Sequence, residues 1–178
     1  MNTIISKTEK FTLLADLGTI TVPNSYSAMT RLKKFREKYY GNILPDEDNL
    51  TNFLRGIKRF PNPSHAIKRG DKLRVRAFRQ VVGGETTSKE RMAFLDTKKA
   101  IYIGSQGLMI VFEQKRKILP KDFRYISFDK KRYLLIDSKG SHRMPCIKDY
   151  QDGEFSFVFI HFKAKLYVDQ AFFCFNKI

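Results

Sequence analysis

The spacing of apolar residues changes at one proline-rich break, Phe60–Ser64, and this change restricts the folds open to the chain. Before the break, most apolar residues recur at the three- and four-residue intervals of helices. After it, they alternate at the two-residue interval of strands almost to the last residue. Helix-length connections, which parallel strands require, are not expected between those strands. The sequence therefore predicts an α+β fold in two parts, residues 1–62 and residues 63–178.

The N-terminal part is expected to hold a hairpin and two helices. Phe11–Val22 alternates loosely around Asp16–Gly18, which predicts two short strands joined by a turn. Residues 29–39 carry apolar side chains at helical spacing, and Gly41 follows as a stop. A second helix is expected from Asp46, because the acidic residues of its first turn suit the positive end of the helix dipole.

The second part is expected to be a small antiparallel β-barrel or sandwich. Turns rich in Gly, Asp and Ser separate short strand-like runs at hairpin spacing. Apolar residues occupy both faces of the last run, which predicts a strand buried on both sides, at the centre of a sheet in preference to a dimer seam. Strands are expected at Ile67–Val82, Arg91–Ile103, Leu108–Gln114, Phe123–Phe128, Arg132–Ile136 and Glu154–Phe175.

Lysine and arginine greatly outnumber the acidic residues. The chain has 34 Lys and Arg against 18 Asp and Glu, which gives a net charge of +16 and a pI near 9.9. Self-repulsion of this size disfavours a compact state, so a polyanionic partner that relieves it is expected. Ribosome-associated and membrane-surface proteins share this bias, and nucleic acid is the preferred interpretation.

The most informative stretch for binding is Lys68–Phe78. Because side chains alternate across a strand, Lys72, Arg74 and Arg76 share one face, and the aliphatic residues between them enter the core. Neighbouring cations on that face are about 6.6 to 7 Å apart, close to the phosphate spacing of a nucleic-acid strand. An ordinary solvent-facing strand is the alternative. Phosphate contacts are expected from Lys68, Arg69, Lys72, Arg74 and Arg76.

Part of this stretch, Gly70-Asp71 followed by alternating aliphatic residues, resembles the opening strand of a KOW motif. That motif is the short element of SH3-like small barrels in ribosomal proteins and transcription elongation factors. It continues into a glycine-bearing turn and a second aliphatic strand, whereas here Gly83 comes late and Glu85–Glu90 is polar. The resemblance implies binding to nucleic acid or to a transcription complex, as in MotB-like phage early DNA-binding proteins that act on host chromatin and transcription.

A second group of cations lies in residues 115–148. This span has eleven Lys and Arg against three Asp in the segments that carry them, which is half of the net charge, and most lie at expected turns and strand ends. Solvated hairpin loops are the alternative interpretation. Aromatic residues interleave with these cations and are expected mostly in the core, with an exposed subset available for stacking on single-stranded bases. Phosphate contacts are expected from Lys115, Arg116, Lys117, Lys130, Lys131 and Arg132.

Catalytic, metal and cofactor signatures are not found in the sequence. A ribonuclease would use histidine with lysine or glutamate, but His65 and His142 lie in expected loops and His161 in an apolar strand. The acidic residues are scattered apart from the start of the second helix, and there is no phosphate-binding glycine loop. Cys146 and Cys174 lack metal-ligand spacing and are expected to be reduced packing residues.

The sequence therefore predicts a non-enzymatic nucleic-acid-binding protein without cofactor or metal. Duplex DNA is preferred over RNA as its partner, contacted with low sequence specificity, and the process served is modulation of transcription or chromatin. An inhibitor that covers an acidic surface of a host protein is the alternative, followed by a small ribonuclease. A homodimer remains open. No apolar run approaches the roughly 20 residues of a membrane span and no secretory signal is seen, so a cytoplasmic location, with nucleoid association as an option, is expected.

Overall fold

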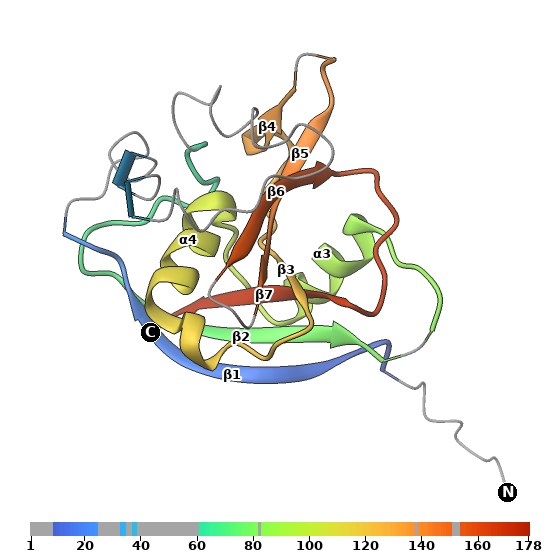
Figure 1. Ribbon diagram of the computed structural model, residues 1–178, viewed down its shortest axis with the longest axis horizontal. Coiled ribbons are helices and arrows are strands. Elements are labelled where there is room, and N and C mark those ends of the chain that lie inside the picture. The colour runs from blue at the N-terminus through green and yellow to red at the C-terminus, as the bar shows by residue number, and fades with distance from the viewer. Residues whose placement is uncertain are drawn as a thin grey trace, which may run out of the picture.

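The computed structural model describes residues 9–24, 33–34, 37–38, 61–81, 83–137, 139–150 and 154–178 (Figure 1). The helix expected from Asp46 lies outside these residues. Of the helix expected over residues 29–39, only 33–34 and 37–38 are described. These four residues are helical, and Lys33 and Glu37 form an exposed ion pair of 3.8 Å one turn apart.

An open, mostly antiparallel sheet of seven strands and two α-helices forms the described part of the chain. The strand order is β1-β2-β7-β3-β5-β4, and β6 pairs with β5; only the β3–β7 pair is parallel. The α+β class is confirmed, but the sheet does not close and no barrel or sandwich is formed among the described residues. The elements are β1 (Phe11–Thr21), β2 (Lys72–Gln80), α3 (Ser88–Thr97), α4 (Gly104–Lys115), the 3-10 helix η2 (Arg116–Ile118), β3 (Arg124–Ile126), the 3-10 helix η3 (Lys131–Tyr133), β4 (Leu135–Ile136), β5 (His142–Asp149), β6 (Phe155–His161) and β7 (Gln170–Lys177).

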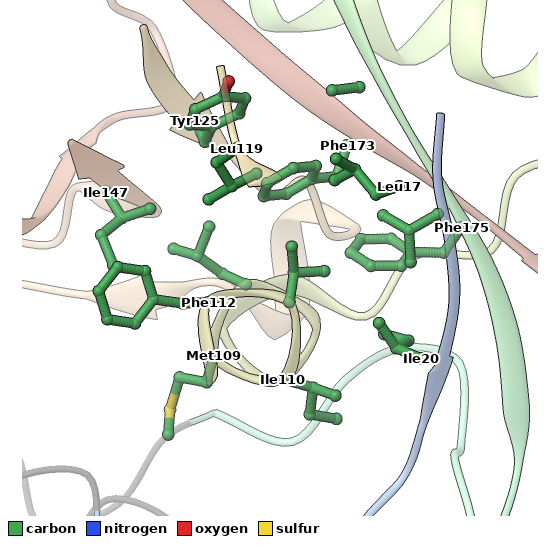
Figure 2. Packing of buried hydrophobic residues seen from close by; sticks show 14 of the residues in the cluster. Leu17, Ile20, Met109, Ile110, Phe112, Leu119, Tyr125, Ile147, Phe173 and Phe175 are labelled. Carbon is green, nitrogen blue, oxygen red and sulfur yellow. The ribbon is translucent and has the colours of Figure 1, made fainter. Parts of the chain in front are cut away.

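The two helices cover opposite faces of the sheet, so there are two hydrophobic clusters. Helix α4 lies in the first, against Phe173 and Phe175 of β7 (Figure 2). Helix α3 contributes Leu95 to the second, with Phe172 of β7 and Phe78 of β2. Strand β7 is thus buried on both faces, at the centre of the sheet, as expected for the last apolar run.

That last run is nevertheless two strands and not one. β6 ends at His161, and β7 begins at Gln170 after a turn. β6 turns Phe155, Phe157 and Phe159 into the first cluster and leaves its other face only partly covered. The alternation correctly placed Phe155, Phe157 and Phe159 on one buried face, but the two-sided burial predicted for this run holds for β7 and not for β6, and the sequence did not reveal the turn.

The predicted hairpin at Phe11–Val22 is wrong, because the segment is one continuous edge strand, β1. It pairs along its whole length with β2, and the register shifts between Leu13 and Ala15 and again between Asp16 and Gly18. At the second irregularity Gly18 has a φ of +70°, and its N–H donates to Asp16 Oδ1 at 3.0 Å. The expected turn residues therefore form a β-bulge. Since β1 belongs to the same sheet as β2, the division expected at residues 62 and 63 does not divide the sheet.

Both helices replace segments expected as strands. Helix α3 begins with a capping box, in which Thr87 Oγ1 accepts from the Glu90 N–H and the Glu90 carboxylate accepts from the Thr87 N–H. Helix α4 is buried from Gly104 to Phe112, on all sides. A short apolar run buried on all sides has no helical periodicity, so spacing did not distinguish it from a buried strand.

Strand β5 was not among the expected strands, and it contains a proline, Pro145. The Pro145 carbonyl accepts from the Ser127 N–H at 3.3 Å, so the proline nitrogen also faces the β3 and β4 side of the strand. On that side β3 ends at Ile126 and β4 pairs only from Leu135 onward. Ser127 therefore lies opposite Pro145 just beyond the end of β3, and the proline lacks only the reciprocal bond to the Ser127 carbonyl.

None of the helices in the described ranges combines the length and apolar character needed to cross a membrane.

Candidate nucleic-acid interface

The strand predicted to carry phosphate contacts is β2, and its alternation is confirmed. Leu73, Val75 and Ala77 are fully buried in the first cluster, whereas Lys72 and Arg74 are exposed on the other face. Helix α3 covers that face only towards the end of β2, where Phe78 enters the second cluster. The first half of β2 therefore presents its cations to solvent, and Lys68 and Arg69 are exposed in the turn before it.

Arg74 is not a free cation. Its guanidinium pairs with the carboxylate of Asp16 in the β1 bulge at 2.5 Å, 58 residues away in the sequence. This hydrogen bond lowers the pKa of Asp16 and holds its negative charge beside the arginine. The pair is largely exposed, so its contribution to stability is small. A phosphate would have to compete with Asp16 for this side chain.

Arg76 has a structural position. It is half-buried, donates to Asn176 Oδ1 on β7 at 2.9 Å, and lies 5.8 Å from the ring centroid of Phe78. Asn176 in turn donates from Nδ2 to the carbonyl groups of Lys98 and Lys99 after α3. Arg76 thus helps to join β2, β7 and the end of α3, which makes it the least accessible cation of the strand.

The group Lys115–Lys117 lies at the end of α4 and in η2, and its members differ in environment. Arg116 pairs with the buried carboxylate of Asp149 on β5 at 2.5 Å and lies over the ring of Phe112, 4.7 Å from its centroid. Lys121 binds the same carboxylate. Arg116 therefore holds the end of α4 against the sheet. Lys115 is half-buried near the β1 bulge, and only Lys117 is fully exposed.

The group Lys130–Arg132 lies in and before η3, at the start of the β4–β5 hairpin, and all three side chains are exposed. The preceding carboxylate, Asp129, is buried at the N-terminal end of α4 and accepts from the Ser64 N–H at 3.2 Å and the Lys130 N–H at 2.7 Å. Burial raises the pKa of Asp129 to about 6 despite these donors. Asp129 therefore does not lie on the surface beside these cations.

A cavity that the sequence did not predict opens beside Lys131. Its volume is about 190 Å³, and none of the described residues that line it carries a carboxylate. His142 and His161 both line this cavity, although the sequence placed His142 in a turn and His161 in an apolar strand. They meet because β5 pairs with β6, and the only sequence signal for this pairing is the Phe155–His161 alternation on one of the two strands. The lining residues are Lys131, Gly140, Ser141, His142, His161, Phe162 and Lys163.

The three predicted groups do not form one patch. Figure 1 shows β4 and the start of β5 at the opposite end of the molecule from β1 and β2. The β2 cations therefore lie far from Lys130–Arg132, and Lys115 lies near the bulge of β1. A polyanion that contacts both the β2 turn and the β4–β5 end has to follow the surface between them.

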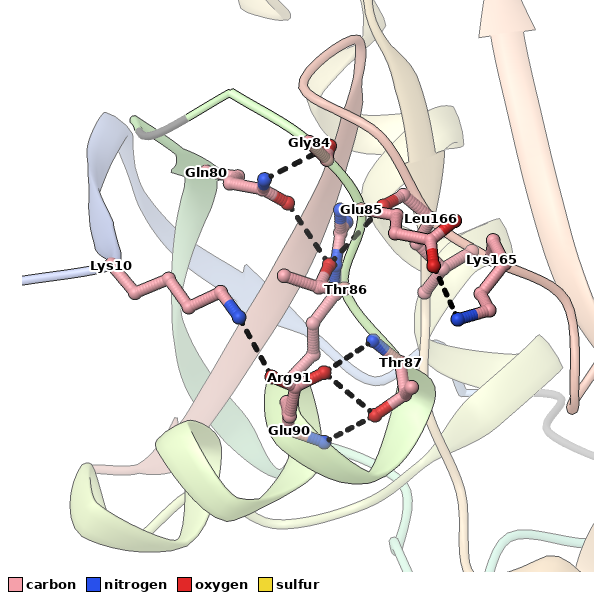
Figure 3. Close-up of polar contacts among 10 residues, drawn as sticks. All are labelled: Lys10, Gln80, Gly84, Glu85, Thr86, Thr87, Glu90, Arg91, Lys165 and Leu166. Atoms are coloured by element: carbon pink, nitrogen blue, oxygen red, sulfur yellow. Dashed lines mark hydrogen bonds and ion pairs between the residues drawn. The ribbon is translucent and has the colours of Figure 1, made fainter.

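Arg91 of α3 has a structural role in a buried hydrogen-bond network, of which Figure 3 shows Arg91, Thr86 and Gln80. Arg91 has no exposed surface and donates to Thr86 Oγ1 at 2.9 Å, to the Tyr167 carbonyl at 2.9 Å, and to the Gln170 carbonyl. Thr86 donates onward to Gln80 Oε1 at 3.0 Å. These bonds join α3, β2 and the segment before β7 without a salt bridge to Arg91 among the described residues.

The aromatic residues that interleave with the second group of cations are mostly core residues, as expected. Tyr102, Phe112 and Tyr125 are buried, and Tyr133 is half-buried with the Arg132 guanidinium 4.9 Å from its ring centroid. They offer no row of exposed rings on which successive bases could stack.

Within the described ranges, no group of three or more His, Cys, Asp and Glu side chains is placed to hold a metal ion. Cys146 and Cys174 are both buried and unpaired with each other, and burial raises the pKa of each thiol. Both are packing residues of the second hydrophobic cluster.

Comparison with known proteins finds no match: no family model, no curated protein sequence and no solved structure is similar to this chain.

Proposed function

We propose that this protein binds nucleic acid without catalysis, by contacts of exposed lysine and arginine side chains with phosphates, and that duplex DNA of any sequence is its partner. One observation carries the proposal. Seven of the eleven predicted contact residues face solvent without an ion pair in the described ranges, and several nearby carboxylates are held by hydrogen bonds or ion pairs within the protein.

Three acids illustrate this arrangement. Asp71 accepts from the backbone N–H of Lys68 at 2.9 Å within the turn before β2. Asp129 and Asp149 are 2% and 4% exposed. Exposed cations without a carboxylate partner favour polyanions at long range. The predicted contacts that are exposed and make no salt bridge within the described ranges are Lys68, Arg69, Lys72, Lys117, Lys130, Lys131 and Arg132.

Duplex is preferred over single strands because the aromatic residues that interleave with the second group of cations are mostly buried. Proteins that bind single strands without sequence preference rely on exposed rings for stacking, and here Tyr102 and Tyr125 are in the core.

Catalysis by a histidine pair is disfavoured by the sheet register. His161 lies opposite Arg143 and not opposite His142 in the β5–β6 ladder, so the two histidines are not a directly facing acid and base, although both border the same cavity. A role in transcription or chromatin rests on the KOW resemblance at Gly70-Asp71.

The test is the salt dependence of binding to a fluorescent duplex with 5′-hydroxyl ends, measured by anisotropy. About 6 neutralised phosphates predict that log affinity falls with log salt at a slope near 5. The double variant Lys68→Gln/Lys72→Gln should lower this slope by about 2 on every sequence. The control Lys165→Gln removes a lysine that is paired with Glu85 and should leave the slope unchanged. A slope near zero for the wild-type protein, or tighter binding to an acidic protein than to DNA, contradicts the proposal.

A further inference from the structure

The cavity at the end of the β5–β6 hairpin, here called the hairpin cavity, is lined by basic and neutral residues. We infer that it is a binding site for a single phosphate group, of the kind carried by a phosphate monoester. The inference goes beyond the proposed function, because it concerns one discrete pocket and not the extended contacts of a duplex backbone.

The charge of the pocket lining supports an anionic ligand. Lys131 and Lys163 contribute two exposed ammonium groups, and His142 and His161 contribute imidazole rings. An imidazole has an N–H donor in either protonation state, and the Ser141 hydroxyl is a further donor. A phosphate presents several acceptor oxygens and up to two negative charges, so it matches this set of donors better than a singly charged carboxylate does.

The nearest acid on the hairpin is prevented from neutralising these cations. Asp137 Oδ1 accepts from the N–H groups of Lys139 and Ser141 at 2.9 and 2.8 Å, and Oδ2 pairs with Arg143 at 2.7 Å. These bonds hold the carboxylate within the β4–β5 turn, and they lower the pKa of Asp137. The Asp137 carboxylate is thus already bonded to the turn backbone and to Arg143. The lysines of the cavity lack a carboxylate partner within the described ranges.

The walls of the cavity are held by backbone hydrogen bonds. The Phe162 N–H donates to the His142 carbonyl at 2.9 Å, which closes the β5–β6 ladder, and the Ala164 N–H donates to the His161 carbonyl at 2.9 Å. The Phe162 carbonyl accepts from the Ser88 hydroxyl of α3 at 2.7 Å. The strand ends are therefore positioned before any ligand arrives, which lowers the entropic cost of binding.

The size of the cavity selects the ligand. Its volume of about 190 Å³ is below the roughly 300 to 1,000 Å³ of pockets that enclose a whole organic ligand. One oxyanion group fits within this volume, and a larger ligand would extend beyond the cavity. A terminal phosphate of a nucleic acid and free inorganic phosphate share this chemistry.

The test is a titration of the full chain with inorganic phosphate at constant ionic strength, followed by the NMR signals of the His142 and His161 rings. Both rings should shift with one saturating curve, and acetate should bind at least about fivefold more weakly. The double variant Lys131→Gln/Lys163→Gln should weaken phosphate binding by between about twofold and about 25-fold, since each exposed ionic contact is worth up to about fivefold. The control Lys177→Gln changes an exposed lysine of β7 and should alter binding less than about twofold.

Two results would overturn the inference: histidine signals that do not respond to phosphate, or equal weakening by the control and by the double variant. Equal affinity for acetate would also reject phosphate as the ligand. Oligonucleotides with and without a 5′-phosphate then separate the two sources, because only a nucleic-acid end gives tighter binding of the phosphorylated strand. The titration uses inorganic phosphate and no DNA, so its result does not depend on whether the protein binds duplex DNA.

Discussion

Replacing Arg91 with methionine sets two opposing contributions to stability against each other. The Arg91 guanidinium is fully buried, 5.2 Å from the ring centroid of Phe172, and this burial lowers its pKa to about 10. Methionine keeps most of the apolar length of the side chain and removes both the charge and the donors. The change therefore relieves the burial of a charge and also deprives buried acceptors of their partner.

The loss is expected to outweigh the gain. Arg91 donates to Thr86, Tyr167 and Gln170, and a hydrogen bond from a charged donor contributes about 1.5 to 3 kcal/mol, so the three together contribute about 5 to 9 kcal/mol. Removing the charge relieves about 3.5 kcal/mol, because burial lowers the pKa from 12.5 to about 10 and one pKa unit corresponds to about 1.4 kcal/mol. Arg91→Met should therefore lower the free energy of unfolding by about 1 to 6 kcal/mol.

The measurement is urea denaturation of the wild-type protein, Arg91→Met and the control Arg79→Met. Arg79 lies on β2 and is exposed, so its replacement should change the free energy of unfolding by no more than about 0.5 kcal/mol. If Arg91→Met proves as stable as Arg79→Met, the buried carbonyl groups have found other donors, and the reasoning that this network holds α3 to the sheet is refuted.

Three further changes test the packing and electrostatics. Gly107→Ala should destabilise the protein by about 1 to 3 kcal/mol in urea denaturation, because the new methyl group would lie 2.5 Å from Ile103 Cγ1; a more stable variant would contradict this. The wild-type protein should lose up to about 3 kcal/mol of stability relative to Asp129→Asn as the pH rises from about 4 to about 6, since the folded state binds the Asp129 proton more tightly than the unfolded state; equal pH profiles would exclude this linkage. Asp149→Asn should cost about 3 kcal/mol by leaving Arg116 without its charged partner, and an unchanged thermal midpoint would show that the pair is dispensable.

The strand face of the predicted interface was open to sequence reasoning, because alternation is a local property. Leu73, Val75 and Ala77 could be assigned to the core from spacing alone. The sequence could not show which cations on the exposed face of β2 are free of protein partners. Arg74 is occupied by Asp16, and Arg76 by Asn176, through pairs that form only when three strands assemble.

The helices were missed for a different reason. The α4 sequence is apolar at nearly every position, so it carries neither the helical nor the strand period that would identify it. Helix α3 has its hydrophobic residues poorly segregated, and the capping box of Thr87 and Glu90 was the available local signal. Because both helices were interpreted as strands, the sequence predicted a barrel or sandwich made of strands. The open sheet with one helix on each face was not predicted.

The sequence by itself determined the excess of positive charge, the α+β class, the face alternation of β2 and β6, and the double-sided burial of β7, since each follows from composition or from neighbours a few residues apart. Only the tertiary structure decided which charges remain exposed and which residues line the hairpin cavity. The pairs that decide this join residues far apart in the chain, 58 for Asp16 with Arg74 and 33 for Arg116 with Asp149. Such contacts depend on strand pairing and helix packing, which short-range periodicity does not encode.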